Sequence, residues 1–167
     1  MIPIVSIVGK SNSGKTTLLV KLIPELKKKG YKVATVKHDV HGFEIDQEGK
    51  DTWKHAKAGA DAVIISSPKK LAMIKRVDEE YSLDRLESSV ISDVDIILSE
   101  GYKKADKPKI EVFRSEVHKE LLCTKDDNLI AIASDRKFDR GVPCFDINDA
   151  RGLADLLEKT FLNRKEE

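Results

Sequence analysis

Nine consecutive residues near the N-terminus have the types and spacing of a phosphate-binding loop: Gly9, Lys10, Ser11, Asn12, Ser13, Gly14, Lys15, Thr16 and Thr17. They satisfy the pattern G-x-x-x-x-G-K-[ST], in which main-chain N–H groups and a helix N-terminus face the phosphates. The lysine of the pattern, Lys15, reaches the β- and γ-phosphates, and the hydroxyl of Thr16 ligates Mg²⁺. The pattern therefore predicts a site for a nucleoside triphosphate with Mg²⁺, in which Thr17 donates to the α-phosphate.

Two roles are open for Lys10. In several dimeric P-loop ATPases a lysine directly after the first glycine reaches the nucleotide of the partner subunit. Here Ser11 and Asn12 replace the paired glycines that are usual in those proteins. We favour a solvated surface lysine over a residue that acts in trans.

A phosphate site of this kind needs a carboxylate near the Mg²⁺, at the end of a neighbouring strand. The apolar segment from Val94 to Gly101 has an acidic residue near each end, Asp95 and Glu100. In a parallel sheet the ligand crevice lies at the carboxyl ends of the strands. We therefore expect Glu100 to hold a Mg²⁺-bound water or to orient an attacking one, and Asp95 to lie at the far boundary of the strand.

A segment rich in histidine and acidic residues follows the second predicted strand. It contains His38, Asp39, His41 and Asp46 within nine positions. We favour a nucleotide-responsive loop, in which Asp39 or Asp46 contacts Mg²⁺ or positions water. A transition-metal site that uses the two histidines is also open, although the H-x-x-H spacing is weak evidence for it, and so is a merely solvated loop.

The elements that position these residues begin with a βαβ unit. The apolar run Ile4–Val8 predicts a buried strand, and leucines at helical spacing predict a helix over Thr16–Lys29, which Pro24 should kink. A second strand follows at Lys32–Lys37. Because a connection of this length implies parallel strands, the fold class is α/β.

Further helices and strands follow at short intervals. The sequence predicts helices at Asp51–Ala58 and Leu83–Val90 and a closing helix that Asn148 caps and that runs through Phe161. Further strands are predicted at 62–66, 71–76, 94–99, 110–113, 129–133 and 144–147. We expect one domain over residues 1–162, a three-layer sandwich of the P-loop NTPase type. Its sheet should be mostly parallel with some antiparallel edge strands and with helices on both faces, and residues 163–167 should form a frayed tail.

The composition excludes several classes of function. The 30 basic and 29 acidic residues nearly cancel, so no global field attracts nucleic acid or an anionic membrane. No apolar run approaches the roughly 20 residues of a membrane span. The two cysteines, Cys123 and Cys144, form no C-x-x-C pair. We therefore expect a cytoplasmic protein that does not bind nucleic acid or a membrane.

Several segments, in a fixed order, resemble one known family. They are Lys37–Gly59, Leu98–Lys103, Pro108–Arg114, Ile130–Asp135, Phe145–Asp149 and Gly152–Asp155. Together with the phosphate loop they resemble the molybdopterin-guanine dinucleotide biosynthesis adaptor (MobB) family over nearly the whole chain. The resemblance implies a P-loop fold, GTP binding with slow hydrolysis and a homodimer; Mg²⁺ is the cofactor that the phosphate loop itself predicts. It also implies assistance to the guanylyltransferase that joins GMP to molybdopterin.

The resemblance also assigns roles to residues. It places the family's phosphate loop on Gly9–Thr17 and its acidic strand end on Glu100. We therefore expect Thr16 and Glu100 at the metal, and Lys15, Glu100 and Asp46 as the catalytic residues. Lys37, His38 and Asp39 fall on the family's histidine–aspartate segment. Asp135 falls where related GTPases bind guanine N1 and N2, and a helix or turn cap is the alternative role for it.

The sequence leaves three further questions open. The lysines at 103, 104, 107 and 109 form a basic cluster that suits a pterin phosphate or an acidic partner, or simply a solvated edge. A small-molecule kinase is disfavoured because arginines are sparse before residue 76. A metal-handling NTPase and an interaction module without turnover are two further classes of protein that the sequence allows.

Overall fold

The computed structural model describes residues 1–124 and 127–163. The contacts of the chain divide it into two compact units, Met1–His38 with Ser82–Glu167, and Asp39–Tyr81. The predicted single domain, residues 1–162, spans both units. Most of the predicted tail, residues 164–167, lies outside the described residues.

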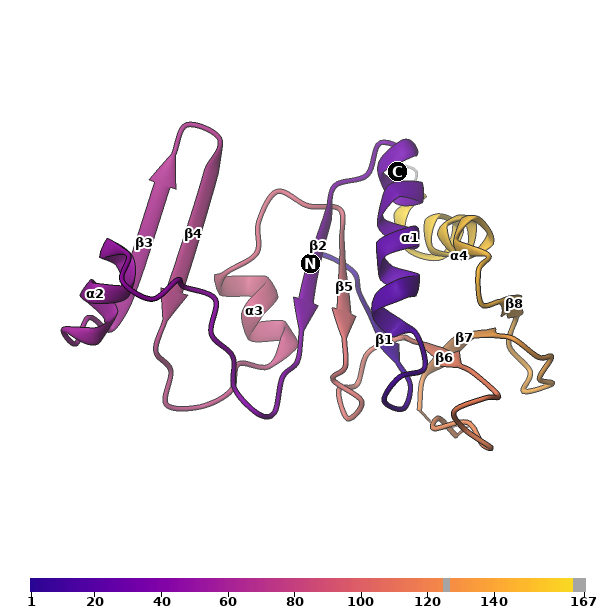
Figure 1. Ribbon diagram of the computed structural model, residues 1–167. Helices are drawn as coiled ribbons and strands as arrows, with labels where there is room; N and C mark the ends of the chain where they lie inside the picture. The colour runs from indigo at the N-terminus through magenta and orange to yellow at the C-terminus, as the bar shows by residue number, and fades with distance from the viewer. Residues whose placement is uncertain (125–126, 164–167) are drawn as a thin grey trace. The chain divides into compact units, whose positions relative to one another are not determined.

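The first unit contains a six-stranded sheet in the order β2-β5-β1-β6-β7-β8. Every neighbouring pair in this sheet is parallel, so all six strands place their carboxyl ends at one edge. Figure 1 shows this shared direction most clearly for β2 and β5. The strands are β1 (Ile4–Val8), β2 (Val33–Lys37), β5 (Ile96–Glu100), β6 (Lys109–Phe113), β7 (Leu129–Ser134) and β8 (Cys144–Asp146). The α/β class is thus confirmed, and β1 lies in the middle of the sheet between β5 and β6.

Helices cover both faces of this sheet because successive residues of its central strands are apolar and buried. Val5 and Leu98 pack with α1 (Lys15–Lys28) and α4 (Ala150–Leu157) in the larger cluster of the core. Ile4 and Ile97 point to the other face and pack with α3 (Leu83–Ser89). Successive side chains of a strand point to opposite faces, so the two clusters form the predicted layers on either side of the sheet.

The first helix, α1, starts directly after the phosphate loop. Leu18, Leu22 and Leu26 are buried along one face of it. The helix continues through Pro24, and Gly30 then adopts a left-handed φ of 93°. Lys29 at its C-terminus donates to Glu158, which ties α1 to the end of the chain.

The closing helix differs from the prediction at its N-terminus. Asp149, not Asn148, is its N-cap, and the Asp149 carboxylate accepts a hydrogen bond from the main-chain N–H of Gly152 at 2.9 Å. Asn148 instead accepts a hydrogen bond from Lys21 of α1. The helix α4 ends at Leu157, and a π-helical turn, Glu158–Leu162, continues it. The predicted cap was therefore wrong by one residue, and the Asn148 side chain binds α1 instead.

The second unit, Asp39–Tyr81, contains α2 (Asp51–Lys57) and an antiparallel pair, β3 (Ala62–Ser67) and β4 (Lys70–Lys75). We expected antiparallel strands at an edge of the main sheet, but β3 and β4 form a sheet of their own. Arg76 joins this pair to α2 by donating to the carbonyl oxygen of Ala56 at 2.7 Å. No described helix has the length and apolar character needed to cross a membrane.

Candidate functional site

The phosphate loop turns sharply between β1 and α1 because three of its residues take positive φ. Gly9, Asn12 and Gly14 have φ of 148°, 62° and 99°. A Cβ atom on Gly9 would lie 2.5 Å from the carbonyl oxygen of Val112 in β6, so only glycine fits there. The turn leaves the N-terminus of α1 at the carboxyl edge of the sheet, where the ligand crevice of a parallel sheet lies.

The ammonium of Lys15 folds back over this turn. It donates to the carbonyl oxygens of Gly9 at 3.2 Å and Lys10 at 2.9 Å. Burial lowers the pKa of Lys15, Glu100 partly offsets this effect, and the charges of Lys103 and Lys37 lower the pKa further. Lys103 and Lys37 are therefore close enough to repel Lys15, and the positive potential at this ammonium suits a polyanion.

Thr16 and Glu100 meet at the carboxyl end of β5. The Thr16 hydroxyl lies 2.9 Å from both carboxylate oxygens of Glu100. Although the two residues are 84 positions apart in the sequence, the structure brings them into contact. The loop hydroxyl and the strand-end carboxylate thus lie together, as expected for the two predicted metal ligands. Hydroxyl and carboxylate oxygens are hard ligands, so this pair fits Mg²⁺. Asp95 lies at the opposite end of β5, where it accepts from the main-chain N–H of Lys32 at 2.6 Å.

The end of β2 lies beside the same carboxylate. Lys37 is the register partner of Glu100, and the main-chain N–H of His38 donates to the carbonyl oxygen of Glu100 at 2.9 Å. The His38 ring packs on Tyr102, with ring centroids 4.7 Å apart. The structure thus brings Lys37 and His38 to the site, as predicted, and places His38 against an aromatic ring.

Asp39 and Asp46 belong to the second unit. Asp39 accepts a hydrogen bond from the main-chain N–H of His41 at 2.9 Å, and Asp46 accepts one from the Thr52 hydroxyl at 3.1 Å. The other carboxylate oxygen of Asp46 is buried and has no partner among the described residues. Their predicted action at the nucleotide stays a prediction. Within residues 1–124 and 127–163, no group of three or more His, Cys, Asp or Glu residues is placed to hold a metal ion.

Asp135 follows β7 at the carboxyl edge of the sheet. Its carboxylate accepts hydrogen bonds from the main-chain N–H of Ser115 at 2.9 Å and from the Ser115 hydroxyl at 2.7 Å. Desolvation raises the pKa of Asp135, but the hydrogen bonds from Ser115 and from its own main chain, together with the charge of Arg114, lower the pKa overall. Asp135 also lines a cavity of about 250 Å³ with Phe145 and Asp146. In the structure Asp135 therefore holds the turn at Ser115 by hydrogen bonds and also lies beside a cavity. Binding of guanine by Asp135 stays a prediction.

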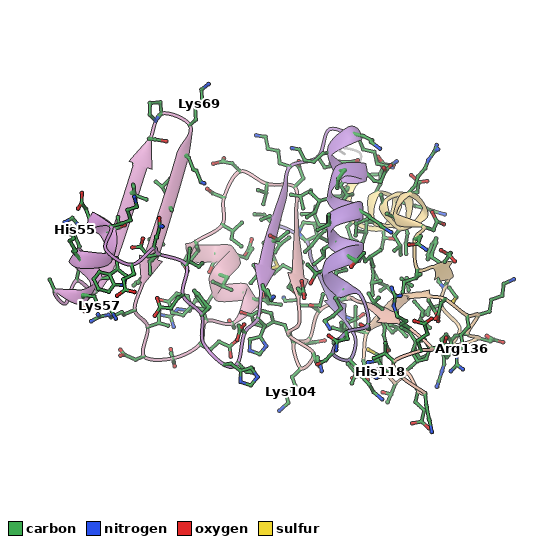
Figure 2. The ribbon with its side chains drawn as sticks, in the orientation of Figure 1. His55, Lys57, Lys69, Lys104, His118 and Arg136 are labelled. Atoms are coloured by element: carbon green, nitrogen blue, oxygen red, sulfur yellow. The ribbon has the colours of Figure 1, made fainter. Side chains whose placement is uncertain are left out.

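The basic cluster is divided by the structure. The Lys109 side chain is buried and donates to the carbonyl oxygens of Ala105 and Asp127, and Lys107 pairs with Asp84 of α3. These two lysines fasten the chain and do not form one exposed surface with Lys103 and Lys104. Figure 2 shows Lys104 on a loop at the carboxyl end of the strands.

Two residues near the loop were missed by the sequence reasoning, Arg114 and His118. A Nη atom of Arg114 lies 3.5 Å from the place of a Cβ on Gly14, and a ring nitrogen of His118 lies 2.8 Å from the carbonyl oxygen of Ser11. Both residues could have been found only from the order of strands in the sheet. Because β6 lies next to β1, the residues that follow β6 reach the loop that follows β1. That order is not readable from the local sequence.

The parallel sheet, the loop between β1 and α1, and the acidic end of β5 together define the P-loop NTPase class of α/β fold. Comparison with known proteins narrows this class. A family model described as molybdopterin guanine dinucleotide synthesis protein B (MobB) matches residues 4–135. The chain belongs to this family.

Individual relatives agree with that assignment. The chain is 37% identical to the molybdopterin-guanine dinucleotide biosynthesis adapter protein of Haemophilus influenzae, and the match covers 94% of the chain and 88% of the relative. It is also 37% identical to the adapter protein of the same name from Escherichia coli, with 94% of the chain and 92% of the relative covered. The crystal structure of Bacillus subtilis MobB superimposes with a TM-score of 0.76 at 32% identity and covers 99% of this chain and 100% of its own. A second crystal structure, of molybdopterin-guanine biosynthesis protein B, gives a TM-score of 0.73 at 33% identity over 93% of this chain and 98% of its own.

Proposed function

We propose that this protein is a GTP-binding adapter of molybdopterin guanine dinucleotide biosynthesis, which assists the guanylyltransferase that attaches GMP to molybdopterin. The observation that carries the nucleotide part of the proposal is the meeting of Thr16 and Glu100 beside Lys15 at the mouth of the phosphate loop. The names of the relatives support the pathway.

The loop residues bind the triphosphate in this proposal. Main-chain N–H groups of Gly9–Thr17 surround the phosphates, and the Lys15 ammonium leaves the carbonyl oxygens of Gly9 and Lys10 for the β- and γ-phosphates. Thr16 and Glu100 would hold Mg²⁺ beside these phosphates. When bound, Mg²⁺ supplies positive charge that neutralises the phosphate oxygens.

Hydrolysis is slow in this proposal and secondary to the adapter role. Glu100 accepts from the Thr16 hydroxyl at 2.9 Å and orients a water in this proposal. The catalytic role of Asp46 stays a prediction from the sequence, in which nucleotide orders the segment from Asp39 to Asp46. Nucleotide binding then changes the surface that the transferase meets, which is a population shift between two arrangements of that segment.

Dimerisation and partner binding use other surfaces. Four large apolar side chains of the β3–β4 pair are 45–68% exposed, namely Ile64, Ile65, Leu71 and Met73. Such a concentration on one hairpin supports a homodimer through the second unit. Lys103 and Lys104 are exposed and suit an acidic face of the transferase or the phosphate of molybdopterin. We propose a cytoplasmic location for this assembly.

Complex formation with a molybdopterin guanylyltransferase tests the proposal. Size-exclusion chromatography of the two purified proteins should show a complex that is stronger with Mg²⁺ and a non-hydrolysable GTP analogue than with GDP. Lys15→Ala should remove this dependence without preventing folding. If no complex forms with GTP, its analogue or GDP present, the proposed adapter function is wrong. The proposed nucleotide site would be unaffected by that result.

A further inference from the structure

We infer that Arg114 is a second cation for the phosphate chain of the bound nucleotide, presented from the side of the loop opposite Glu100. The inference rests on the proposed function, because it adds a residue to the same nucleotide site. Arg114 begins the segment 114–118, which follows β6 and contacts the phosphate loop.

The position of Arg114 follows from the sheet. The strand β6 lies beside β1, with Val8 and Glu111 in register, while β5 lies on the other side of β1. The chain after β6 therefore passes next to the loop after β1, and the carbonyl oxygen of Val112 is 2.5 Å from the place of a Cβ on Gly9. Arg114 is two residues farther on, with a Nη atom 3.5 Å from the place of a Cβ on Gly14.

Two contacts hold the segment in this place. The Ser115 main-chain N–H and hydroxyl donate to Asp135, so the first half is fastened to the end of β7. His118 fastens the second half, with its Nε2 atom 2.8 Å from the carbonyl oxygen of Ser11 (His118 is labelled in Figure 2). Because a carbonyl oxygen only accepts, Nε2 carries the hydrogen in this contact.

The guanidinium itself is free to bind a ligand. Within residues 1–124 and 127–163, Arg114 is half-buried and its side chain makes no hydrogen bond or ion pair that fixes it; its charge acts on Asp135 only through space. A half-buried guanidinium with five unused donors favours an anion with several acceptor oxygens, and its planar fork matches phosphate. Its distance to Gly14 leaves the phosphates of a loop-bound nucleotide within its reach.

Calorimetric titration of the full-length protein with Mg²⁺ and GTP tests this role. Arg114→Ala should weaken GTP binding about 10- to 100-fold, because it removes hydrogen bonds between charged groups. Arg114→Lys should lie between this variant and the wild type, since it keeps the charge and loses the fork. Arg151→Ala, which removes an exposed arginine from the start of α4, is the matched control and should bind GTP as the wild type does.

His118 is a positioning residue, and its test separates positioning from folding. His118→Ala should weaken GTP binding several-fold, and His118→Gln, which restores a donor toward Ser11, should recover most of the loss. The thermal midpoints of the nucleotide-free variants should stay close to the wild type. Wild-type affinity in Arg114→Ala would overturn the inference while the proposed function stands, whereas a wild-type protein that binds no GTP would end the proposed function itself.

Discussion

Replacement of Gly9 by alanine tests the geometry of the phosphate loop. The new Cβ would lie 2.5 Å from the carbonyl oxygen of Val112 and 2.7 Å from the hydroxyl of Ser13, at a φ of 148°. The unfavourable backbone conformation costs about 1–3 kcal/mol, and overpacking against a rigid strand costs about another 1–3 kcal/mol. We expect the free energy of unfolding to fall by about 2–6 kcal/mol, from a total that is typically about 5–15 kcal/mol.

Urea denaturation measures this loss against a matched control. Gly30 also has a positive φ, 93°, but a Cβ there would meet no atom within 4 Å, so Gly30→Ala reports backbone strain alone. With a urea slope of about 2 kcal/mol per molar, Gly9→Ala should lower the unfolding midpoint by about 1–3 M. Equal losses in the two variants would show that Gly9 is not pressed against β6, and the reasoning about the loop would be wrong.

Three further predictions concern the chemistry of the site. Mg²⁺ should strengthen GTP binding to the wild type, and in Glu100→Gln this strengthening should be smaller by a factor of about ten or more. Titrations with and without Mg²⁺ measure it, and an equal effect of Mg²⁺ on both proteins would exclude Glu100 from the metal site. Burial lowers the pKa of Lys15 in the nucleotide-free protein, and bound phosphates should raise this pKa again. GTP binding should therefore be accompanied by proton uptake at alkaline pH, somewhat below the ordinary lysine pKa of about 10.4. At neutral pH Lys15 is protonated in both states, so it should take up no proton there. Calorimetry in two buffers of different ionisation enthalpy should detect this uptake, and Lys15→Arg should abolish it. Asp135→Asn should lower the ratio of GTP to ATP affinity if Asp135 binds guanine, whereas equal losses for both nucleotides would leave Asp135 only its contact with Ser115.

The phosphate loop and its acidic partner were predictable because each depends on local sequence and on one rule of sheet geometry. Gly9, Gly14 and Lys15 are close in the chain, and the end of an apolar strand placed Glu100 at the same edge. The contact of Thr16 with Glu100 confirms that Glu100 lies at the same edge of the sheet as the phosphate loop. The ligand itself stays a prediction.

Other features depended on long-range contacts that a linear pattern does not contain. Arg114 and His118 reach the loop because β6 inserts beside β1, and the sequence does not give the order of strands. Lys109 was expected in an exposed basic cluster, but its side chain is buried against main-chain carbonyl groups. The pairing of β3 with β4 as a separate sheet likewise follows from contacts within the second unit.

The most direct test of the central claim is a calorimetric titration of the purified protein with GTP in the presence of Mg²⁺, repeated with Lys15→Ala. Saturable binding of GTP to the wild type, weakened at least about tenfold in the variant, is the predicted result, because the ammonium pairs with charged phosphate oxygens. Absence of binding to the wild type, or equal binding to both proteins, would contradict the assignment of the loop as a nucleotide site.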